Sequence, residues 1–252
     1  MIPVLDDLRL VSVGRLVLHE AHDVGRLAAL KERMLTEGVQ RNPIIVSPFG
    51  GDYLVLDGAH RLRALSELGC TMVLVQLAEL PARVESWSHL VDERMVRRAL
   101  EEMDGVEVGR GERWLLSVVF SSGEEVFVKP ARPGIPAEID LLWALQRGYP
   151  KGAPVRRVES GVPLDPPSGE ALVRYRRFTP EELHQVVRLG KVLPAGITRF
   201  RIRERVLGVC FPLEKMYSGD EAGRSAELKS FVRRMWEGGK VRRYEEPVVL
   251  FE

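Results

Sequence analysis

The chain has 252 residues, of which 45% are hydrophobic and 29% are charged, and its formal net charge is +1. This length and balance fit a globular protein of one large or two small domains. A nearly neutral chain without a basic footprint does not favour nucleic acid as a partner. Its two cysteines, Cys70 and Cys210, stand far apart, which argues against a disulfide framework or a zinc site and favours the cytoplasm. No apolar stretch approaches the roughly 20 residues of a membrane span, so no membrane association is expected.

The first hundred residues are predicted to alternate strands and helices. Apolar periodicity and turn residues give, in order, one or two strands in 8–18, a helix 24–37, strands on both sides of a Gly-Gly turn in 42–56, a helix 60–68, a strand 72–77 and a helix 90–103. Asp23 is the expected N-cap of the first helix, and Gly38 its end.

The second half is predicted to begin with a β-hairpin. The predicted elements are the hairpin 114–128, a helix 136–147, a loop 161–169, a strand 171–178, a helix 180–189 with Thr179 as cap and Pro180 at its first position, a helix 227–236 and a strand 247–251. We place a domain boundary near residue 104, which gives domains 1–104 and 105–252.

The seam between a predicted strand and helix, LVLDGAHRLRAL at 54–65, concentrates polar groups. A glycine there lets backbone approach a ligand, and the first turn of a helix attracts anions. His60 and Arg61 add donors, and Arg can bind two phosphate oxygens in parallel. Asp57 would repel a bare phosphate but suits a cation or a reacting proton. Alternatively, Asp57 is only a helix N-cap and Arg61 a solvated charge. Because four polar groups converge on one turn, we favour a functional site.

The same seam carries a family resemblance. VLDGAHRLRALSELG, preceded by NPIIV, resembles the nucleotide-binding core of the ParB/sulfiredoxin superfamily. Sulfiredoxins place a catalytic cysteine where this chain has Ala59, and ParB proteins continue with a helix-turn-helix module where this chain has a hairpin. The third branch, the free L-serine kinases, is similar to this chain over nearly its whole length.

Two further stretches resemble those kinases. In LHEAH, Glu20 matches their catalytic base, and in KVLPAGITRF, Thr198 and Arg199 match two residues of a Thr-Arg-His triplet that contacts the amino-acid substrate. Trp87 falls near a tryptophan of the same pocket. Phe200 replaces the triplet's histidine and cannot donate a hydrogen bond. Arg33 stands where a smaller polar residue is expected, so the resemblance leaves the substrate open.

The resemblance implies an α/β (α+β) fold with a ParB/sulfiredoxin-like N-terminal domain and a second α/β domain forming a cleft. It implies a small-molecule kinase that transfers phosphate from ATP or ADP, with Mg²⁺, to the hydroxyl of free L-serine or a similar hydroxy amino acid, giving O-phospho-L-serine. Glu20 and Asp57 would be catalytic, and no residue is assigned as a dedicated metal ligand. Asp57, Gly58, Ala59, His60 and Arg61 would hold the nucleotide, and Trp87, Thr198, Arg199 and Phe200 the substrate.

Other interpretations of these residues stay open. Glu20 also fits an exposed loop acid, Trp87 a core residue, and Arg199 part of a solvated basic run. His19, His22 and His89 are expected to be solvated or to support other side chains. A non-catalytic, nucleotide-responsive regulator that binds DNA or a protein partner is the alternative function, although it would not need Glu20 or the Thr-Arg pair.

Overall fold

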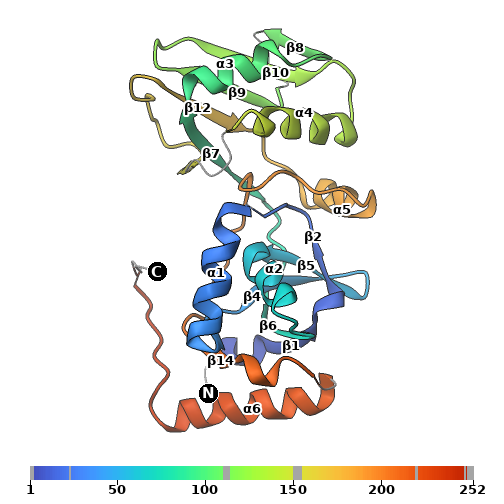
Figure 1. Ribbon diagram of the computed structural model, residues 1–252, viewed down its shortest axis with the longest axis vertical. Coiled ribbons are helices and arrows are strands. Elements are labelled where there is room, and N and C mark those ends of the chain that lie inside the picture. The colour runs from blue at the N-terminus through green and yellow to red at the C-terminus, as the bar shows by residue number, and fades with distance from the viewer. Residues whose placement is uncertain are drawn as a thin grey trace.

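The computed structural model describes residues 3–22, 24–109, 114–149, 155–218, 221–246 and 248. These residues form two bodies stacked along the long axis of the molecule (Figure 1). The mixture of sheets and helices confirms the predicted α/β (α+β) class.

The first body is built from the N-terminal elements and a returning C-terminal segment. Its elements are η1 (Pro3–Asp7), β1 (Leu8–Ser12), η2 (Val13–Arg15), β2 (Leu16–Leu18), α1 (Val24–Glu37), β3 (Val39–Gln40), β4 (Ile44–Phe49), β5 (Asp52–Asp57), α2 (Ala59–Glu67), β6 (Met72–Leu77), β14 (Phe211–Pro212), η3 (Leu213–Lys215) and α6 (Glu221–Glu237). A five-stranded sheet runs in the order β1-β6-β4-β5-β2. The strands β4 and β6 are nearly continuous buried apolar runs, as expected where both faces of a sheet are covered.

The second body is one antiparallel sheet with helices packed on it. Its elements are β7 (Glu85–Asp92), α3 (Glu93–Glu101), β8 (Val106–Gly109), β9 (Leu116–Phe120), β10 (Glu125–Pro130), α4 (Ile135–Arg147), β11 (Arg156–Glu159), β12 (Glu170–Tyr175), α5 (Pro180–Arg188) and β13 (Thr198–Arg199). The strand order is β11-β7-β12-β9-β10-β8, and β13 pairs with β7. Thr179 caps α5, as the sequence predicted, and Glu182 completes a capping box with it.

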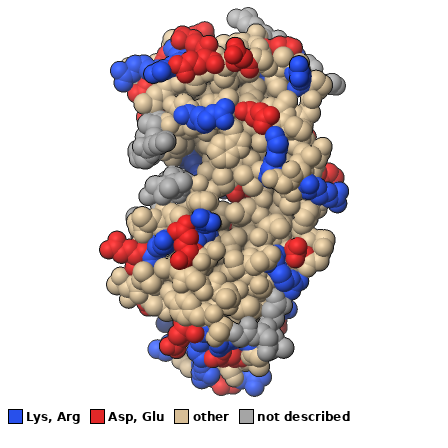
Figure 2. Space-filling model, turned by 45° about the vertical axis from the view of Figure 1, so that its right-hand side comes forward, with Lys and Arg blue, Asp and Glu red and all other residues tan. Residues whose placement is uncertain are grey.

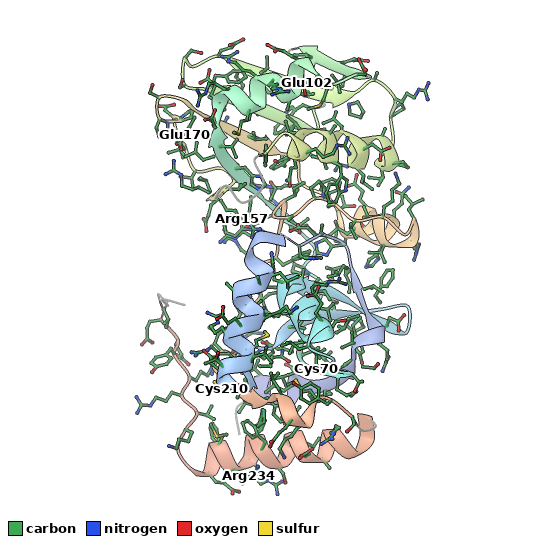
Figure 3. The ribbon with its side chains drawn as sticks, in the orientation of Figure 1. Cys70, Glu102, Arg157, Glu170, Cys210 and Arg234 are labelled. Atoms are coloured by element: carbon green, nitrogen blue, oxygen red, sulfur yellow. The ribbon has the colours of Figure 1, made fainter. Side chains whose placement is uncertain are left out.

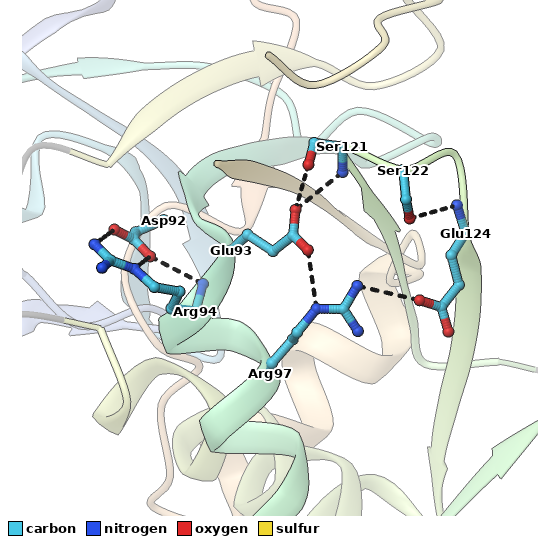
Figure 4. Close-up of polar contacts among 7 residues, drawn as sticks. All are labelled: Asp92, Glu93, Arg94, Arg97, Ser121, Ser122 and Glu124. Carbon is cyan, nitrogen blue, oxygen red and sulfur yellow. Dashed lines mark hydrogen bonds and ion pairs between the residues drawn. The ribbon is translucent and has the colours of Figure 1, made fainter. Parts of the chain in front are cut away.

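Polar contacts fix the start of α3 against the hairpin β9–β10 (Figure 4). The Asp92 carboxylate accepts from the Arg94 backbone N–H at 2.9 Å, which caps the helix. The Glu93 carboxylate accepts from the Ser121 hydroxyl at 2.6 Å and from Arg97 at 2.9 Å. This network explains why the helix predicted at 90–103 begins three residues later. Residues 90–92, which the prediction gave to that helix, are instead the end of the strand β7, whose residues 88–91 are all buried.

The C-terminal helix is longer than predicted. The expected helix at 227–236 spans 17 residues as α6, and it packs against β1. Neither α6 nor any other helix of the described residues is apolar over a length that could cross a bilayer. Asp23, the predicted cap of α1, lies outside the described residues, as does the predicted strand 247–251 apart from Val248.

The distribution of the two hydrophobic cores bears on the domain boundary. The strand β7 and helix α3 pack in the core of the second body, together with Val84 and Val96. After β13 the chain returns, and Phe211 and Leu228 join the core of the first body. The division at 104/105 stays a prediction, and this packing favours a boundary near residue 84 with a return near residue 200.

Candidate active site

A cavity of about 1460 Å³ lies between the two bodies. The surface is hollowed near mid-height, where they meet (Figure 2). All the residues that the sequence singled out line this cavity: Glu20, Asp57, Gly58, Ala59, His60, Arg61, Trp87, Thr198, Arg199 and Phe200. Segments more than 170 residues apart in sequence, such as Glu20 and Thr198, therefore meet at one site.

The strand-to-helix seam begins at a glycine in the left-handed region. Gly58 is the N-cap of α2, with φ 105° and ψ 24°, and no side chain caps the helix. The alternative of Asp57 as N-cap is therefore wrong. A Cβ at Gly58 would lie 2.9 Å from the Arg61 guanidinium, so a side chain there would have to displace Arg61 and adopt a left-handed backbone that L residues rarely adopt. The N-terminus of α2, with its uncapped first turn and positive dipole end, faces the cavity.

Asp57 lies between two arginines at the edge of the cavity. Its carboxylate is 2.7 Å from the Arg205 guanidinium and 3.3 Å from that of Arg61. Burial alone would raise the pKa of Asp57, but the charges and hydrogen bonds of these arginines outweigh it and hold the pKa below its ordinary value. The Nε of Arg61 is buried without a hydrogen-bond partner. An N–H donor left over beside a helix N-terminus is suited to an anionic ligand.

Glu20 anchors the loop before β13. Its Oε2 accepts from the backbone N–H of Thr198 at 2.9 Å, from that of Ile197 at 3.2 Å and from the Thr198 hydroxyl at 2.6 Å. Its Oε1 accepts from the Gly196 N–H. Residues on either side of Glu20 also bridge to Leu193. Glu20 is thus an organised carboxylate in a two-body contact, and not the exposed loop acid of the alternative interpretation.

His19 stands directly behind Glu20 and Thr198. Its Nδ1 is 2.9 Å from the Val55 carbonyl, and its Nε2 is 2.8 Å from the Thr198 hydroxyl. Only 4% of His19 is exposed. Burial lowers its pKa, although the Glu20 charge and the Val55 hydrogen bond oppose that shift. The Phe200 ring packs edge-on against His19 with centroids 5.3 Å apart. His19 therefore supports other residues, and it is not solvated.

Arg199 and Trp87 form the opposite wall. The Arg199 guanidinium lies 4.5 Å from the centre of the Trp87 ring, in a cation–π contact. It also pairs with Glu159, and with Glu85 at 3.8 Å. The hydrogen bond from Arg199 holds the pKa of Glu159 below its ordinary value. Arg199 is consequently a fixed, partly buried cation and not a member of a solvated run.

Five further arginines line the cavity beyond Arg61 and Arg199: Arg33 of α1, Arg41, Arg157 of β11, Arg201 and Arg205. Figure 3 shows Arg157 at the junction of the two bodies. The segment that carries Arg205 is held by Gln76, whose side chain contacts the Glu204 carbonyl and the Val206 N–H. No motif marks Arg157 or Arg205, because only the fold brings them to the cavity.

A second histidine chain supports the same loop from the side of the second body. His89 is 1% exposed, and its Nε2 lies 2.7 Å from the Gly196 carbonyl. Its Nδ1 is 3.0 Å from the Tyr175 hydroxyl, which is 2.9 Å from that of Tyr149. Burial lowers the pKa of His89 to about 4, the nearby Arg157 charge contributes to the same shift, and the hydrogen bond to the Gly196 carbonyl opposes it.

Comparison with known proteins finds similarity to kinases of free serine. No protein-family model matches the sequence. The ATP-dependent L-serine kinase SbnI of Staphylococcus aureus is 27% identical over 253 residues, which cover 98% of both chains. The structure of C-terminally truncated SbnI superimposes with a TM-score of 0.76 at 25% identity, over 94% of this chain and all of that one.

A more distant structure shares the fold. A free serine kinase in complex with AMP matches with a TM-score of 0.62 at 20% identity, over 83% of this chain and 93% of that chain. The full-length similarity to SbnI and this shared architecture agree with the motifs at Glu20, the α2 seam and Thr198–Arg199. The resemblance to the free serine kinases is therefore confirmed, and the chain is similar over 98% of its length to one ATP-dependent L-serine kinase.

Proposed function

We propose that this protein is a kinase that transfers a phosphoryl group from ATP or ADP to the hydroxyl of free L-serine, or of a similar hydroxy amino acid. The single observation that carries the proposal is the convergence of a carboxylate, an uncapped helix N-terminus and a fixed arginine on one cavity. Phosphoryl transfer depends mainly on alignment and charge stabilisation, and these groups supply both.

The nucleotide phosphates would bind at the start of α2. The left-handed Gly58 opens the turn, the first N–H groups of the helix face the cavity, and the buried Nε of Arg61 has a donor to spare. His60, whose ring lies 6.3 Å from that of His22, lines the same wall. Arg205 and Arg33 add positive charge. A phosphate chain would neutralise this excess of donors and cations.

The residues fit a magnesium ion that accompanies the nucleotide and do not form a metal cage of their own. The described residues contain no group of three or more side chains that would hold a metal. Mg²⁺ in nucleotide sites takes one or two carboxylates, with phosphates and water for the rest. Asp57 is the carboxylate beside the phosphate site, and its depressed pKa keeps it in the anionic form that a cation requires. When bound, the ion would neutralise developing phosphate charge.

The acceptor amino acid would lie between Glu20 and the wall of Arg199 and Trp87. Arg199 would hold the carboxylate, and Glu20 would take the hydroxyl proton. Phe200 is 5% exposed and offers no donor, so a slightly larger hydroxy amino acid such as threonine is a plausible competitor of serine. The free thiols of Cys70 and Cys210 support the cytoplasmic location that forms part of this proposal.

The test is a transfer assay with purified protein, Mg²⁺, each of ATP and ADP, and a panel of serine, threonine and homoserine. We expect a phosphorylated amino acid in amounts equal to the nucleotide consumed, with serine accepted. Arg199→Ala should weaken every carboxylate-bearing acceptor by a similar factor. Nucleotide binding in calorimetry without transfer to any acceptor would contradict the kinase proposal and favour the regulator.

A further inference from the structure

The Thr198 hydroxyl has two close neighbours that can accept a hydrogen bond but only one hydrogen to donate. Nδ1 of His19 faces the Val55 carbonyl, which can only accept, so Nδ1 carries the proton and Nε2 of a neutral His19 is bare. The Thr198 hydroxyl has one hydrogen and two close neighbours, Nε2 of His19 at 2.8 Å and Oε2 of Glu20 at 2.6 Å. When the carboxylate is ionised, both neighbours are acceptors, and only one of them can receive the hydrogen.

The two oxygens of Glu20 carry different numbers of hydrogen bonds. Oε2 receives three contacts, from Ile197, Thr198 N–H and the Thr198 hydroxyl, whereas Oε1 receives one, from Gly196. A carboxylate oxygen offers about two lone-pair sites. Oε1 is therefore the oxygen with capacity left for a hydroxyl in the cavity, and Oε2 is the one that Thr198 senses.

We propose that His19 is a positioning residue whose bare Nε2 takes over the Thr198 hydrogen when Glu20 becomes protonated. This inference rests on the proposed kinase function. Glu20 Oε1 takes the acceptor's hydroxyl proton as the acceptor oxygen bonds to the transferred phosphorus. The bond from that phosphorus to the nucleotide oxygen breaks, with its electron pair left on the nucleotide. The Thr198 O–H bond stays intact and turns from Glu20 to His19.

The exchange has a physical reason. A hydrogen bond to an ionised carboxylate is stronger than one to a neutral acid, so Thr198 opposes protonation of Glu20 if it has nowhere else to donate. An acceptor at 2.8 Å removes that opposition, and it lets the hydroxyl return when the proton leaves. Burial suits His19 to this role, because it keeps the imidazole neutral. The charged groups that line the same cavity include Glu20, Asp57 of β5, Arg61 of α2 and Arg199 of β13.

Two substitutions at His19 separate this role from a purely structural one. In His19→Asn, the amide can still donate to the Val55 carbonyl, but nothing reaches Thr198. In His19→Gln, the longer side chain places an amide oxygen near Nε2, and the Val55 contact is lost. We expect His19→Asn to lower kcat by about 10-fold, with both KM values within about two-fold, because one hydrogen bond is lost. His19→Gln should retain more activity.

Thr198 provides a matched pair. Thr198→Val removes, at constant shape, the hydroxyl that opposes protonation of Glu20, so it should lower kcat less than His19→Asn does, and Thr198→Ser should stay near wild type. The double variant His19→Asn/Thr198→Val should be faster than His19→Asn and close to Thr198→Val, because without the hydroxyl Nε2 of His19 has no hydrogen to accept. Melting temperatures check that each variant folds, and the Thr198 pair decides the matter if a His19 variant does not.

Steady-state kinetics, with the serine and nucleotide concentrations varied separately, gives kcat and both KM values for each variant. A lower kcat in His19→Gln than in His19→Asn would mean that the Val55 contact matters and would overturn the inference. Additive losses in the double variant, or a loss in Thr198→Val as large as in His19→Asn, would overturn it as well. An inactive wild-type protein would overturn the kinase proposal together with this inference, whereas an active one with additive losses overturns this inference alone.

Discussion

Two buried histidines hold the same loop from opposite sides, and their hydrogen-bond chains differ in one respect. In the chain of the second body, Tyr149 donates to Tyr175, Tyr175 to His89, and His89 to the Gly196 carbonyl, so each contact has its hydrogen. In the chain of the first body, the contacts of Thr198 outnumber its hydrogens. A complete network fixes a loop in place, and an incomplete one beside a cavity is suited to proton chemistry.

The comparison is tested most strongly at Glu20. Glu20→Gln retains size and one acceptor oxygen but removes the proton acceptor, so turnover should fall by about 100-fold or more, with nucleotide affinity within a few-fold. Single-turnover assays and calorimetry measure the two effects. Glu159→Gln, at another carboxylate of the cavity, is the control and should lose less. Turnover close to wild type in Glu20→Gln would show that the base is elsewhere.

The hydrogen-bond chain of the second body predicts that acid lowers the free energy of unfolding, because it holds His89 buried and neutral. Its pKa is about 4 in the folded protein, against 6.5 in the unfolded chain. The unfolded state therefore binds the proton first, and the free energy of unfolding is fully present above pH 6.5 and decreases as pH falls toward 4. The loss is on the order of 3 kcal/mol. Urea unfolding at pH 7, 5.5 and 4.5 should show it.

His89→Gln should reduce this acid dependence, because glutamine does not titrate and can still donate to the Gly196 carbonyl. The difference between the wild-type and variant free energies of unfolding should shrink as pH falls. Parallel pH curves for the two proteins would mean that His89 takes up its proton without cost.

Gly196 is the residue that both chains share, and its geometry offers a matched comparison. It has φ +79°, and a Cβ there would lie 2.5 Å from the Arg157 guanidinium, whereas Gly169 has φ +80° with nothing within 4 Å. Gly169→Ala should cost about 1 kcal/mol for the left-handed backbone alone. Gly196→Ala should cost about 1 kcal/mol more, or a further 2–4 °C in melting temperature. Equal losses would mean that Arg157 moves aside freely.

The smallest expected effect on stability is at Tyr149, the first donor in the hydrogen-bond chain of the second body. Tyr149→Phe removes the donor to Tyr175 but leaves the His89 contacts intact. The free energy of unfolding should fall by about 1 kcal/mol, and turnover of the folded variant should stay near that of wild type. A large loss of turnover would show that the two chains are coupled through the loop.

Much of the fold follows from local pattern. The Gly-Gly turn between β4 and β5, the Thr179 cap of α5 and the end of α1 at Gly38 are set by nearby residues, and the sequence predicted them correctly. The strand β7 was missed at its position before α3, because its pairing with β11, β12 and β13 involves residues 64 or more positions away. Such pairings leave no local signal.

The candidate site divides in the same way. The α2 seam and Glu20 were singled out because their residues stand in recognisable motifs, and the fold brings them to one cavity. His19, Arg157 and Arg205 were not assigned roles, because a lone histidine or arginine has no distinguishing neighbours in sequence. Only the fold brings His19 to Thr198 and Arg205 to Asp57.

The pairing of β13 with β7 has a consequence for how the molecule is divided. Arg199 lies opposite Glu85 and Thr198 opposite Ser86, so the chain enters and leaves the second body at one place. Residues 85–199 thus have the topology of an insertion whose two ends lie side by side. If they were excised, only a short gap between residues 84 and 200 would have to be closed. Such a cut would divide the cavity. The first body would keep Glu20, Asp57 and the α2 seam. The excised residues 85–199 would carry Trp87, Thr198 and Arg199. Neither piece alone would hold both the phosphate groups and the acceptor.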